Sequence, residues 1–207
     1  MNSQTRTITL AVTGASGSLY SLRLLECLLQ TQYQVCLLIS QAGRLVLRTE
    51  LELTLPAQSK DVEDLFRQRF AAQPGQLRVF SQQQWTASIA SGSNVPQAMI
   101  VCPCTTGTLS SIAGGLSSNL IERAAAVILK EQRKLILVVR EMPLSILQLE
   151  NMLRLARSGV IIMPASPGFY FKPQRVDDLI DFVVARILDH LDIPHKLTPK
   201  WGNSDHS

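Results

Sequence analysis

The segment TITLAVTGASGSLYSLRLLECLL, residues 7–29, decides the fold because it reads as a strand, a tight turn and a helix in direct succession. Thr7–Val12 is an apolar run of strand length, Thr13–Gly17 is rich in glycine and serine, and helical spacing follows from about Leu19 to Leu29. The same alternation continues to the end of the chain. Further strands are predicted at Gln34–Ile39, Ala98–Cys102, Lys134–Val139 and Val160–Met163, and helices at Gln41–Glu50, Asn119–Lys130, Ser145–Arg157 and Val176–Leu191.

Strand–helix alternation of this kind implies right-handed crossovers between parallel strands. Both faces of such a sheet are covered by helices, so its strands are apolar throughout, as they are here. The sequence therefore predicts an α/β protein, a three-layer, doubly wound parallel sheet. Leu55–Val95 has poor periodicity and Ser88–Pro96 reads as a loop, whereas residues 193–207 read as an extended C-terminal arm or lid.

Composition favours a single folded domain over residues 1–207. Of the 207 residues, 46% are hydrophobic and 17% charged, which is ample for a core. The net charge of +4 without a basic stripe argues against nucleic-acid binding. The polar N-terminus carries no signal core and no apolar run reaches the ~18 residues of a membrane span, so we expect a cytoplasmic protein.

Small and hydroxylated residues follow the predicted strands, at the place where doubly wound sheets bind ligands. They are Thr13–Gly17, Ser40 and Thr105–Thr108. A glycine–serine turn that leads into a helix offers N–H groups and a positive dipole end to an anion, although each turn alone is equally a tight connection. Two such turns at one crevice favour a phosphate. Because the GxGxxG spacing is absent, a mononucleotide is favoured over a dinucleotide.

Charged side chains in apolar surroundings suggest a second phosphate site. Arg140 and Glu141 directly follow an apolar strand. Arg123 and Lys130, seven residues apart, share one helix face, and Arg186 interrupts the apolar stripe of the last helix. Each of these residues alone reads equally as part of a surface ion pair. Together they suit a phosphate, which arginine binds with two parallel hydrogen bonds.

Two groups of potential metal ligands are better explained without a metal. Asp177, Asp178 and Asp181 spell the DDxxD motif of isoprenoid synthases, but acidic residues in a first helical turn favour the helix dipole and no second acidic motif follows. Cys102 and Cys104 lack the CxxC spacing and read as packing residues. We therefore expect no metal site.

Taken in order, six motifs resemble the flavin prenyltransferases of the UbiX type. The resemblance covers nearly all of the chain except Leu55–Val95. The motifs are TGASG (13–17), CPCTTGTLSSIAGG (102–115), NLIERAAAVILKE (119–131), VVREMPLSILQLENMLRL (138–155), PASPGFYFKP (164–173) and DLIDFVVARILDHLDIP (178–194).

The resemblance implies a flavodoxin-like or Rossmann-like fold in a homo-oligomer, typically a dodecamer, that binds FMN between subunits. It implies a metal-independent transfer of a dimethylallyl group from dimethylallyl monophosphate to N5 and C6 of reduced FMN. The product, prenylated FMN, then serves a UbiD-type decarboxylase, often in ubiquinone biosynthesis.

The same resemblance assigns residues to roles. Those that match FMN contacts are Gly14, Ala15, Ser16, Ser40, Thr105, Thr106, Gly107, Thr108 and Arg140. Those that match binding of the dimethylallyl phosphate are Lys130, Arg140, Tyr170 and Arg186. Those that match catalytic positions are Ser16, Glu50 and Glu141 for proton movement, Trp85 near the allyl group, and Lys130, Arg123 and Trp201 around the site. Cationic donors stabilise a leaving phosphate, and burial beside Arg140 would tune the pKa of Glu141.

Three alternatives are weaker. A flavin-dependent cysteine decarboxylase uses a histidine in the first half of the chain, where this sequence has none before His190. A non-catalytic FMN carrier does not need Glu50, Lys130, Tyr170 and Arg186 together. A nicotinamide oxidoreductase needs an acidic residue where Ser40 stands. Among departures from the family pattern, Gln148 stands where many members carry histidine, and Ser18 and Ser21 replace smaller residues.

Overall fold

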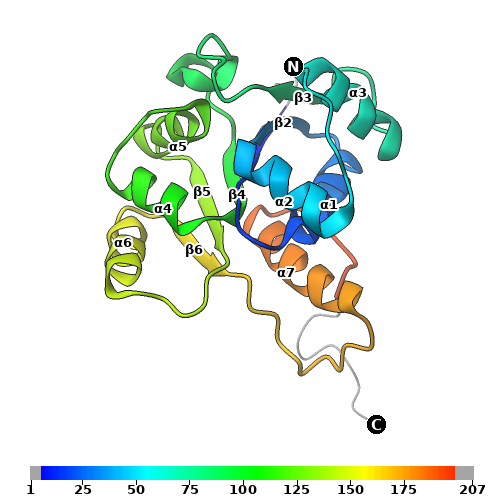
Figure 1. Ribbon diagram of the computed structural model, residues 1–207, viewed down its shortest axis with the longest axis vertical. Coiled ribbons are helices and arrows are strands. Elements are labelled where there is room, and N and C mark those ends of the chain that lie inside the picture. The colour runs from blue at the N-terminus through cyan, green and yellow to red at the C-terminus, as the bar shows by residue number, and fades with distance from the viewer. Residues whose placement is uncertain (1–5, 199–207) are drawn as a thin grey trace. The chain divides into compact units, whose positions relative to one another are not determined.

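The computed structural model describes residues 6–198 (Figure 1). The chain divides into two compact units, one that reaches to Pro164 and one that begins at Ala165. Each unit is described by itself. The expectation of a single domain over residues 1–207 with an arm over residues 193–207 stays a prediction.

The first unit is built on one sheet of six parallel strands in the order β3-β2-β1-β4-β5-β6. Every predicted strand is confirmed to within two residues, because each is an apolar run. All of them are buried on both faces of the sheet except the edge strand Ile161–Pro164, which is only partly buried. The strands are β1 (Thr7–Val12), β2 (Gln34–Ile39), β3 (Leu77–Phe80), β4 (Ala98–Cys104), β5 (Lys134–Val139) and β6 (Ile161–Pro164).

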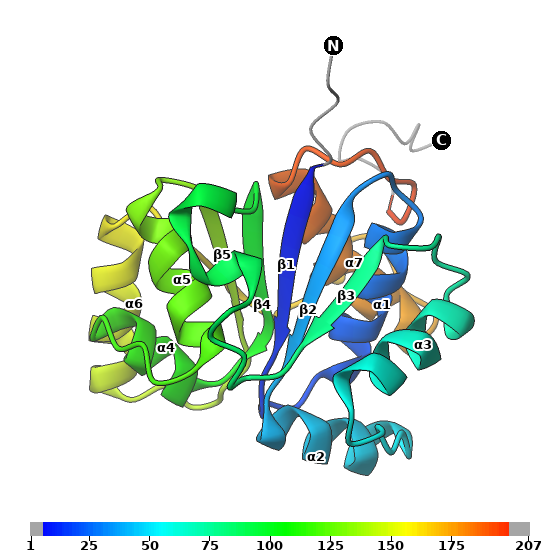
Figure 2. The ribbon, with the colours of Figure 1, turned by 90° about the horizontal axis from the view of Figure 1, so that it is seen from above.

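Helices cover both faces of this sheet. Figure 2 shows α1 and α3 on one side and α4, α5 and α6 on the other. Their bounds are α1 (Ser18–Leu29), α2 (Gln41–Leu51), α3 (Ser59–Arg69), α4 (Thr106–Ala113), α5 (Leu120–Lys130) and α6 (Ile146–Arg157). The three-layer, doubly wound arrangement is thereby confirmed.

The strand order reverses at β1. The chain runs outward through β2 and β3 on one side of β1, and through β4, β5 and β6 on the other. In doubly wound sheets, ligands bind beyond the carboxyl ends of the strands at such a switch point, which here lies where β1 and β4 end. Thr13–Gly17 connects β1 to α1, and Thr105 connects β4 to the first turn of α4.

The poorly patterned stretch Leu55–Val95 holds more structure than the sequence indicated. It contains α3, the edge strand β3, and two short 3-10 helices, η1 (Ser88–Ala90) and η2 (Gly92–Asn94). β3 has only four residues, and it lacks a continuous apolar run because Arg78 points outward over the ring of Phe80, 5.3 Å from its centroid. Pairing with β2 forms this strand, and local propensity does not.

Side-chain caps begin the helices that follow β4 and β5. The Asn119 carboxamide accepts the N–H groups of Ile121 and Glu122. Ser145 and Gln148 form a reciprocal capping box at the start of α6. Gln148, where the related pattern often has histidine, thus has a structural role.

The second unit contains α7 (Val176–His190). Its apolar stripe is confirmed, since Ile180, Val183, Val184, Ile187 and Leu188 are all buried. The Asp178 carboxylate accepts the N–H groups of Gln174 and Arg175 and so caps the helix. This agrees with the prediction that the acidic residues of the DDxxD sequence stabilise the first turn of a helix. Within residues 6–198, none of the helices combines the length and apolar character needed to cross a bilayer.

Candidate functional site

Thr13 joins the two loops of the switch point. Its hydroxyl donates to the Pro103 carbonyl at 2.7 Å and accepts the Thr105 N–H at 2.8 Å, while its own N–H donates to Pro103 at 3.2 Å. The side chain is almost fully buried, so these hydrogen bonds are shielded from water. The β1 and β4 loops therefore form one rigid cradle. Thr13 was not among the predicted site residues, although its place between strand and glycine turn was a usable signal.

A carboxylate of the protein itself binds some of the N–H groups of the turn after β1. Glu50, in the last turn of α2, accepts the N–H of Gly17 at 3.1 Å and that of Ser18 at 2.8 Å. Partial burial raises the pKa of Glu50, but hydrogen bonds from Ser16, Ser18 and Gly17 outweigh it, and the pKa lies below its ordinary value. The expected anion cradle is corrected here, because two of its N–H groups already bind Glu50. The N–H groups of Gly14, Ala15 and Ser16 have no protein partner within residues 6–198.

The second cradle begins α4. The Thr105 hydroxyl accepts the Thr108 N–H at 3.1 Å and donates to the Thr108 hydroxyl at 2.9 Å. The N–H groups of Thr106 and Gly107 have no protein partner in the described part of the chain. A Cβ atom on Gly107 would meet only Thr105 Oγ1, at 3.9 Å, so the loop is open on that side. These donors suit a phosphate or another anion.

Gly14 is required by a close approach between the β1 turn and α2. A Cβ atom at this position would overlap the Cβ atom of Ala42. Ser40 caps α2 by accepting the Gly43 N–H at 2.9 Å, so its hydroxyl hydrogen is still available to a ligand. The β1 turn, Ser40 and the α4 cradle thus line the carboxyl edge of the sheet together.

Arg140 reaches the same edge from the end of β5. Its Nε donates to the Ser16 carbonyl at 3.3 Å, which leaves its terminal nitrogens for other partners. Glu141 is exposed and accepts the Met142 N–H at 3.2 Å. In the single chain, Glu141 is therefore exposed and not buried beside Arg140.

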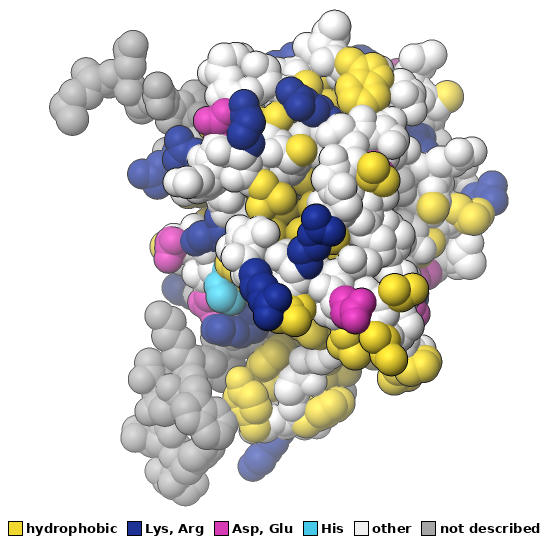
Figure 3. Space-filling view, turned by 90° about the vertical axis from the view of Figure 1, so that its left-hand side faces the viewer, with side chains coloured by type: hydrophobic (Ala, Val, Ile, Leu, Met, Phe, Trp, Pro, Cys, Tyr) yellow, Lys and Arg dark blue, Asp and Glu magenta, His cyan; other side chains and the backbone are white. Residues whose placement is uncertain are grey.

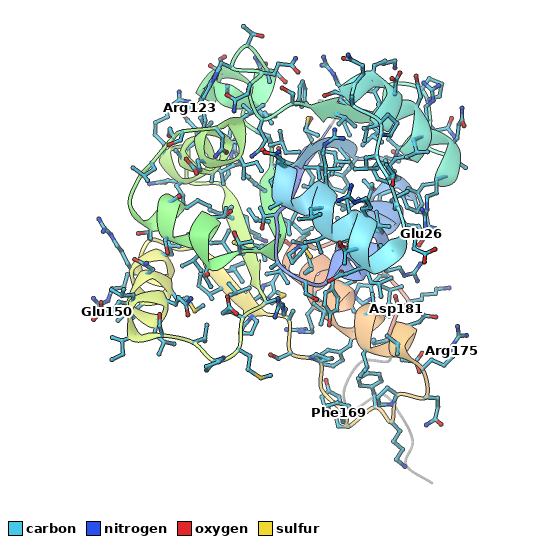
Figure 4. The ribbon with its side chains drawn as sticks, in the orientation of Figure 1. Glu26, Arg123, Glu150, Phe169, Arg175 and Asp181 are labelled. Atoms are coloured by element: carbon cyan, nitrogen blue, oxygen red, sulfur yellow. The ribbon has the colours of Figure 1, made fainter. Side chains whose placement is uncertain are left out.

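Lys130 and Arg123 do not join this cluster. Lys130 ends α5 and pairs with Glu131 at 2.9 Å, and Glu131 lines a cavity of about 700 Å³ together with Thr7 and Gln34, the first residues of β1 and β2. Lys130 thus lies toward the amino edge of the sheet, opposite the cradles. Arg123 lies on the same helix, where its Nε donates to the Ala90 carbonyl of η1 at 3.0 Å (Figure 4). The predicted shared face of these two residues is confirmed, since both border the η1–η2 segment.

Trp85 is half-exposed in the turn after β3. The neighbouring Gln82 ties this turn down by accepting the N–H of Gln41 with its side chain and that of Leu120 with its carbonyl. In the second unit, the Tyr170 ring lies edge-on to Phe182 with centroids 5.7 Å apart, and Arg186 pairs with Asp189. Trp201 lies outside the described residues.

The four cysteines are buried free thiols. Burial raises the pKa of Cys104 to about 12 and that of Cys102 further, so neither is a nucleophile at neutral pH. Within residues 6–198 no three His, Cys, Asp or Glu side chains are grouped so as to hold a metal ion. The chemical capacity of the site therefore lies in its N–H groups, hydroxyls, Arg140 and the Glu50 carboxylate.

The family model described as Flavoprotein matches residues 1–188. The chain is 55% identical to the flavin prenyltransferase UbiX of Pseudomonas aeruginosa, over 94% of this chain and 93% of that protein. Among solved structures, AnUbiX in complex with FMN and dimethylallyl pyrophosphate has a TM-score of 0.86 at 34% identity and covers 98% of this chain and 100% of its own. A dodecameric FMN-dependent UbiX-like decarboxylase from Escherichia coli O157:H7 has a TM-score of 0.83 at 37% identity, covering 95% and 100%.

Proposed function

The chain belongs to the Flavoprotein family and to the flavin prenyltransferases of the UbiX type, and from this premise we propose how its own residues carry out the reaction. The reaction moves a dimethylallyl group from dimethylallyl monophosphate to N5 and C6 of reduced FMN. Breakage of the allylic C–O bond would release phosphate. Each new carbon–flavin bond would replace a bond to hydrogen, so the site must accept one proton from N5 and one from C6 and return one proton to the double bond of the dimethylallyl group. Reduced FMN, when bound, supplies the nucleophilic ring atoms.

The observation that carries the proposal is the pair of cradles joined by Thr13 at the switch point. The N–H groups of Gly14–Ser16 and of Thr106–Gly107 have no protein partner in the described part of the chain, and the missing Cβ atom of Gly14 lets the β1 turn pack closely on Ala42 of α2. Hydroxyls of Ser40 and Thr108 add donors of the kind that a phosphate ester needs. These residues fit FMN, whose phosphate the N–H groups and hydroxyls would hold.

Arg140 and the β1 turn would act on the reacting end. Arg140 is fixed by the Ser16 carbonyl, so its terminal nitrogens can stabilise the charge that develops on the leaving phosphate. The Ser16 hydroxyl lies in hydrogen-bonding reach of the Glu50 carboxylate, which is ionised at neutral pH and can take up a proton through it. Glu141, exposed beside Arg140, is a second carboxylate for proton transfer.

A complete site needs a second subunit. Lys130 and Arg123 lie away from the cradles of their own chain, so we infer that a neighbouring copy supplies them to the prenyl phosphate. By the family resemblance, Tyr170 and Arg186 would bind the phosphate and Trp85 would serve near the allyl group, while Trp201, outside the described residues, matches a position around the site. This requirement supports a homo-oligomer, which we propose is a dodecamer.

One surface fits a neighbouring copy. Large apolar side chains follow Glu141 and continue along α6, with Met142 exposed by 87%, Ile146 by 75% and Leu147 by 72%. Leu144, Leu149 and Leu153 extend the same surface, and Figure 3 shows apolar side chains gathered on the side of the molecule that carries α6. Exposed apolar patches of this kind mark interfaces. Since this α6 surface starts beside Glu141, a copy seated on it would border the site.

We further propose that prenylated FMN passes to a UbiD-type decarboxylase, that no metal is required, and that the protein acts in the cytoplasm. The first two statements have direct tests. The extracted product should activate a UbiD-type apoenzyme, and a chelator should leave the transfer unchanged.

The central experiment is anaerobic incubation with reduced FMN and dimethylallyl monophosphate, followed by mass spectrometry of the extracted flavin. We expect a flavin heavier by one five-carbon unit. A parallel reaction with the diphosphate defines the preferred leaving group. Bound but unmodified FMN with both donors would instead favour a carrier of FMN.

A further inference from the structure

Hydrogen bonds join three side chains of the second unit, those of Arg186, Asp189 and His195. Arg186 is the one that is proposed to bind phosphate. Nη1 of Arg186 donates to Oδ2 of Asp189 at 2.6 Å, and Nε2 of His195 lies 3.0 Å from Oδ1 of the same carboxylate. Both oxygens of Asp189 are therefore engaged. One carboxylate links an arginine on α7 to a histidine that follows the helix.

The end of α7 creates this arrangement. Arg186 and Asp189 are three residues apart, so they are neighbours on the helix surface. The helix ends at His190 with Leu191 as its C-cap, and Asp192 takes a left-handed conformation (φ 57°) that turns the chain back. The Ile193 N–H then donates to the Leu188 carbonyl at 3.0 Å, and His195 returns to the last turn of the helix.

The hydrogen bonds of His195 define which of its ring nitrogens carries the hydrogen. The Leu197 N–H donates to Nδ1 of the ring at 3.4 Å, so Nδ1 carries no hydrogen. In the neutral ring the hydrogen must then lie on Nε2, which donates it to Asp189. The His195 side chain is only 10% exposed, so this donor is largely shielded from water. His195 thereby restricts the Asp189 carboxylate to one orientation.

Arg186 keeps most of its donors free. Its side chain is 53% exposed, and Asp189 uses a single nitrogen of a group that has five N–H donors. An exposed Arg–Asp pair three residues apart contributes little to stability, so the pair is a weak device for folding. It does restrict a long side chain whose free rotation would otherwise have to be lost when a ligand binds.

We propose that Asp189 and His195 are positioning residues that hold the Arg186 guanidinium ready for the phosphate of the prenyl donor. The inference rests on the proposed function, in which Arg186 binds that phosphate. Asp189 acts on Arg186 directly, and His195 acts through Asp189. Neither residue contacts the phosphate itself.

The test compares Asp189→Asn and His195→Leu with the conservative variant His195→Gln, whose amide N–H can still donate to Asp189. We expect the first two variants to raise KM for dimethylallyl monophosphate about three- to tenfold with kcat within about twofold of wild type, since roughly one charge-assisted hydrogen bond is disturbed. His195→Gln should restore most of the loss. Calorimetric titration of dimethylallyl monophosphate into protein loaded with oxidised FMN, a state without transfer, should show the same weakening in Kd.

Two further variants distinguish the possible failures. Asp177→Asn breaks the 2.7 Å pair with Arg175 at the other end of α7 and should leave KM unchanged. Arg186→Ala measures the role of the arginine itself. If Arg186→Ala leaves KM unchanged, the proposed phosphate contact fails. If Arg186→Ala raises KM but Asp189→Asn and His195→Leu do not, the positioning role is overturned while the proposed function stands.

Discussion

The carboxylate of Glu50 accepts the backbone N–H of Ser18 at 2.8 Å, across 32 positions of sequence. It therefore caps α1, because Gly17, the residue at the N-cap position of this helix, has no side chain that could do so. One carboxylate thus holds the glycine turn in shape, interacts with the positive end of the helix dipole, and lies in reach of the Ser16 hydroxyl. Both the structural role of Glu50 and its proposed role in proton transfer depend on the same ionised carboxylate. The structural role can be measured separately, through the pH dependence of stability in a Glu50 variant.

Glu50→Gln should destabilise the protein in a pH-dependent manner. Because the folded pKa of Glu50 is lowered, its stabilising effect is complete above the unfolded pKa of about 4.3 and is lost as pH falls through the lower folded pKa. Urea unfolding of wild type and variant should therefore differ most above about pH 5 and converge at lower pH. The exposed neighbour Glu52, changed to Gln, should show no such convergence. A constant difference at every pH would contradict the assigned capping role.

Thr13→Val should loosen the joined cradles at almost constant volume. The buried N–H of Thr105 loses its acceptor and the Pro103 carbonyl loses a donor, which costs about 1–3 kcal/mol. We expect lower stability in urea and weaker retention of FMN. Thr9→Val is the matched control, since Thr9 lies buried in β1, the strand that Thr13 follows, and its hydroxyl has no partner within residues 6–198. Equal effects of the two substitutions would refute the bridging role.

Gly14→Ala should reduce FMN binding, because the new methyl group overlaps the side chain of Ala42. Ala42→Gly should partly restore binding in the double variant, since the next atoms of residue 42 lie 3.4 Å away, at ordinary contact distance. Ala42→Gly alone costs roughly 1 kcal/mol of helix stability but should spare FMN binding. Fluorescence titration of FMN measures all three variants, and a double variant no better than Gly14→Ala would sink the steric explanation.

Mixing two inactive variants tests whether one site draws on two chains. Lys130→Ala and Arg140→Ala change residues at opposite edges of one sheet. If a site takes Lys130 from one subunit and Arg140 from another, random reassembly of equal amounts leaves about a quarter of sites with both residues intact. Prenylation of FMN should then return to about that fraction. Mixtures that stay inactive, although native mass spectrometry shows mixed oligomers, would argue against shared sites.

The α6 surface predicts a change in assembly. Ile146→Glu with Leu147→Glu should yield smaller species by light scattering after gel filtration, because charges cannot be buried unpaired at an interface. Leu147→Met preserves the apolar surface and should retain the wild-type assembly. Glu150 lies on the same helix and is labelled in Figure 4, and Glu150→Gln should have no effect on assembly. An unchanged mass for the double variant would place the interface elsewhere.

The sequence alone was sufficient for the strands and helices whose apolar patterns continue without interruption. Lys134–Val139 was predicted to the residue, and Asn119 and Ser145 marked the starts of α5 and α6 because their side chains cap helices locally. Carboxyl-end residues such as Gly14, Thr105 and Arg140 could be predicted to meet, since parallel strands end at one edge. Gln148 stands where many members of the family carry histidine, and the comparison of motifs did not explain this difference. Its role became visible only in the capping box that it forms with Ser145.

Tertiary structure decided what depends on contacts between distant segments. β3 exists because it pairs with β2, and its four residues carry too little local signal. Glu50 reaches Ser18 and Thr13 reaches Pro103 only after the sheet has brought α2 and β4 beside the first turn. Periodicity records which face of an element is buried, and it contains no information on which partner lies there. The sequence therefore determined the layers and the edge of the sheet that binds, while the packed fold determined which N–H groups remain free for a ligand.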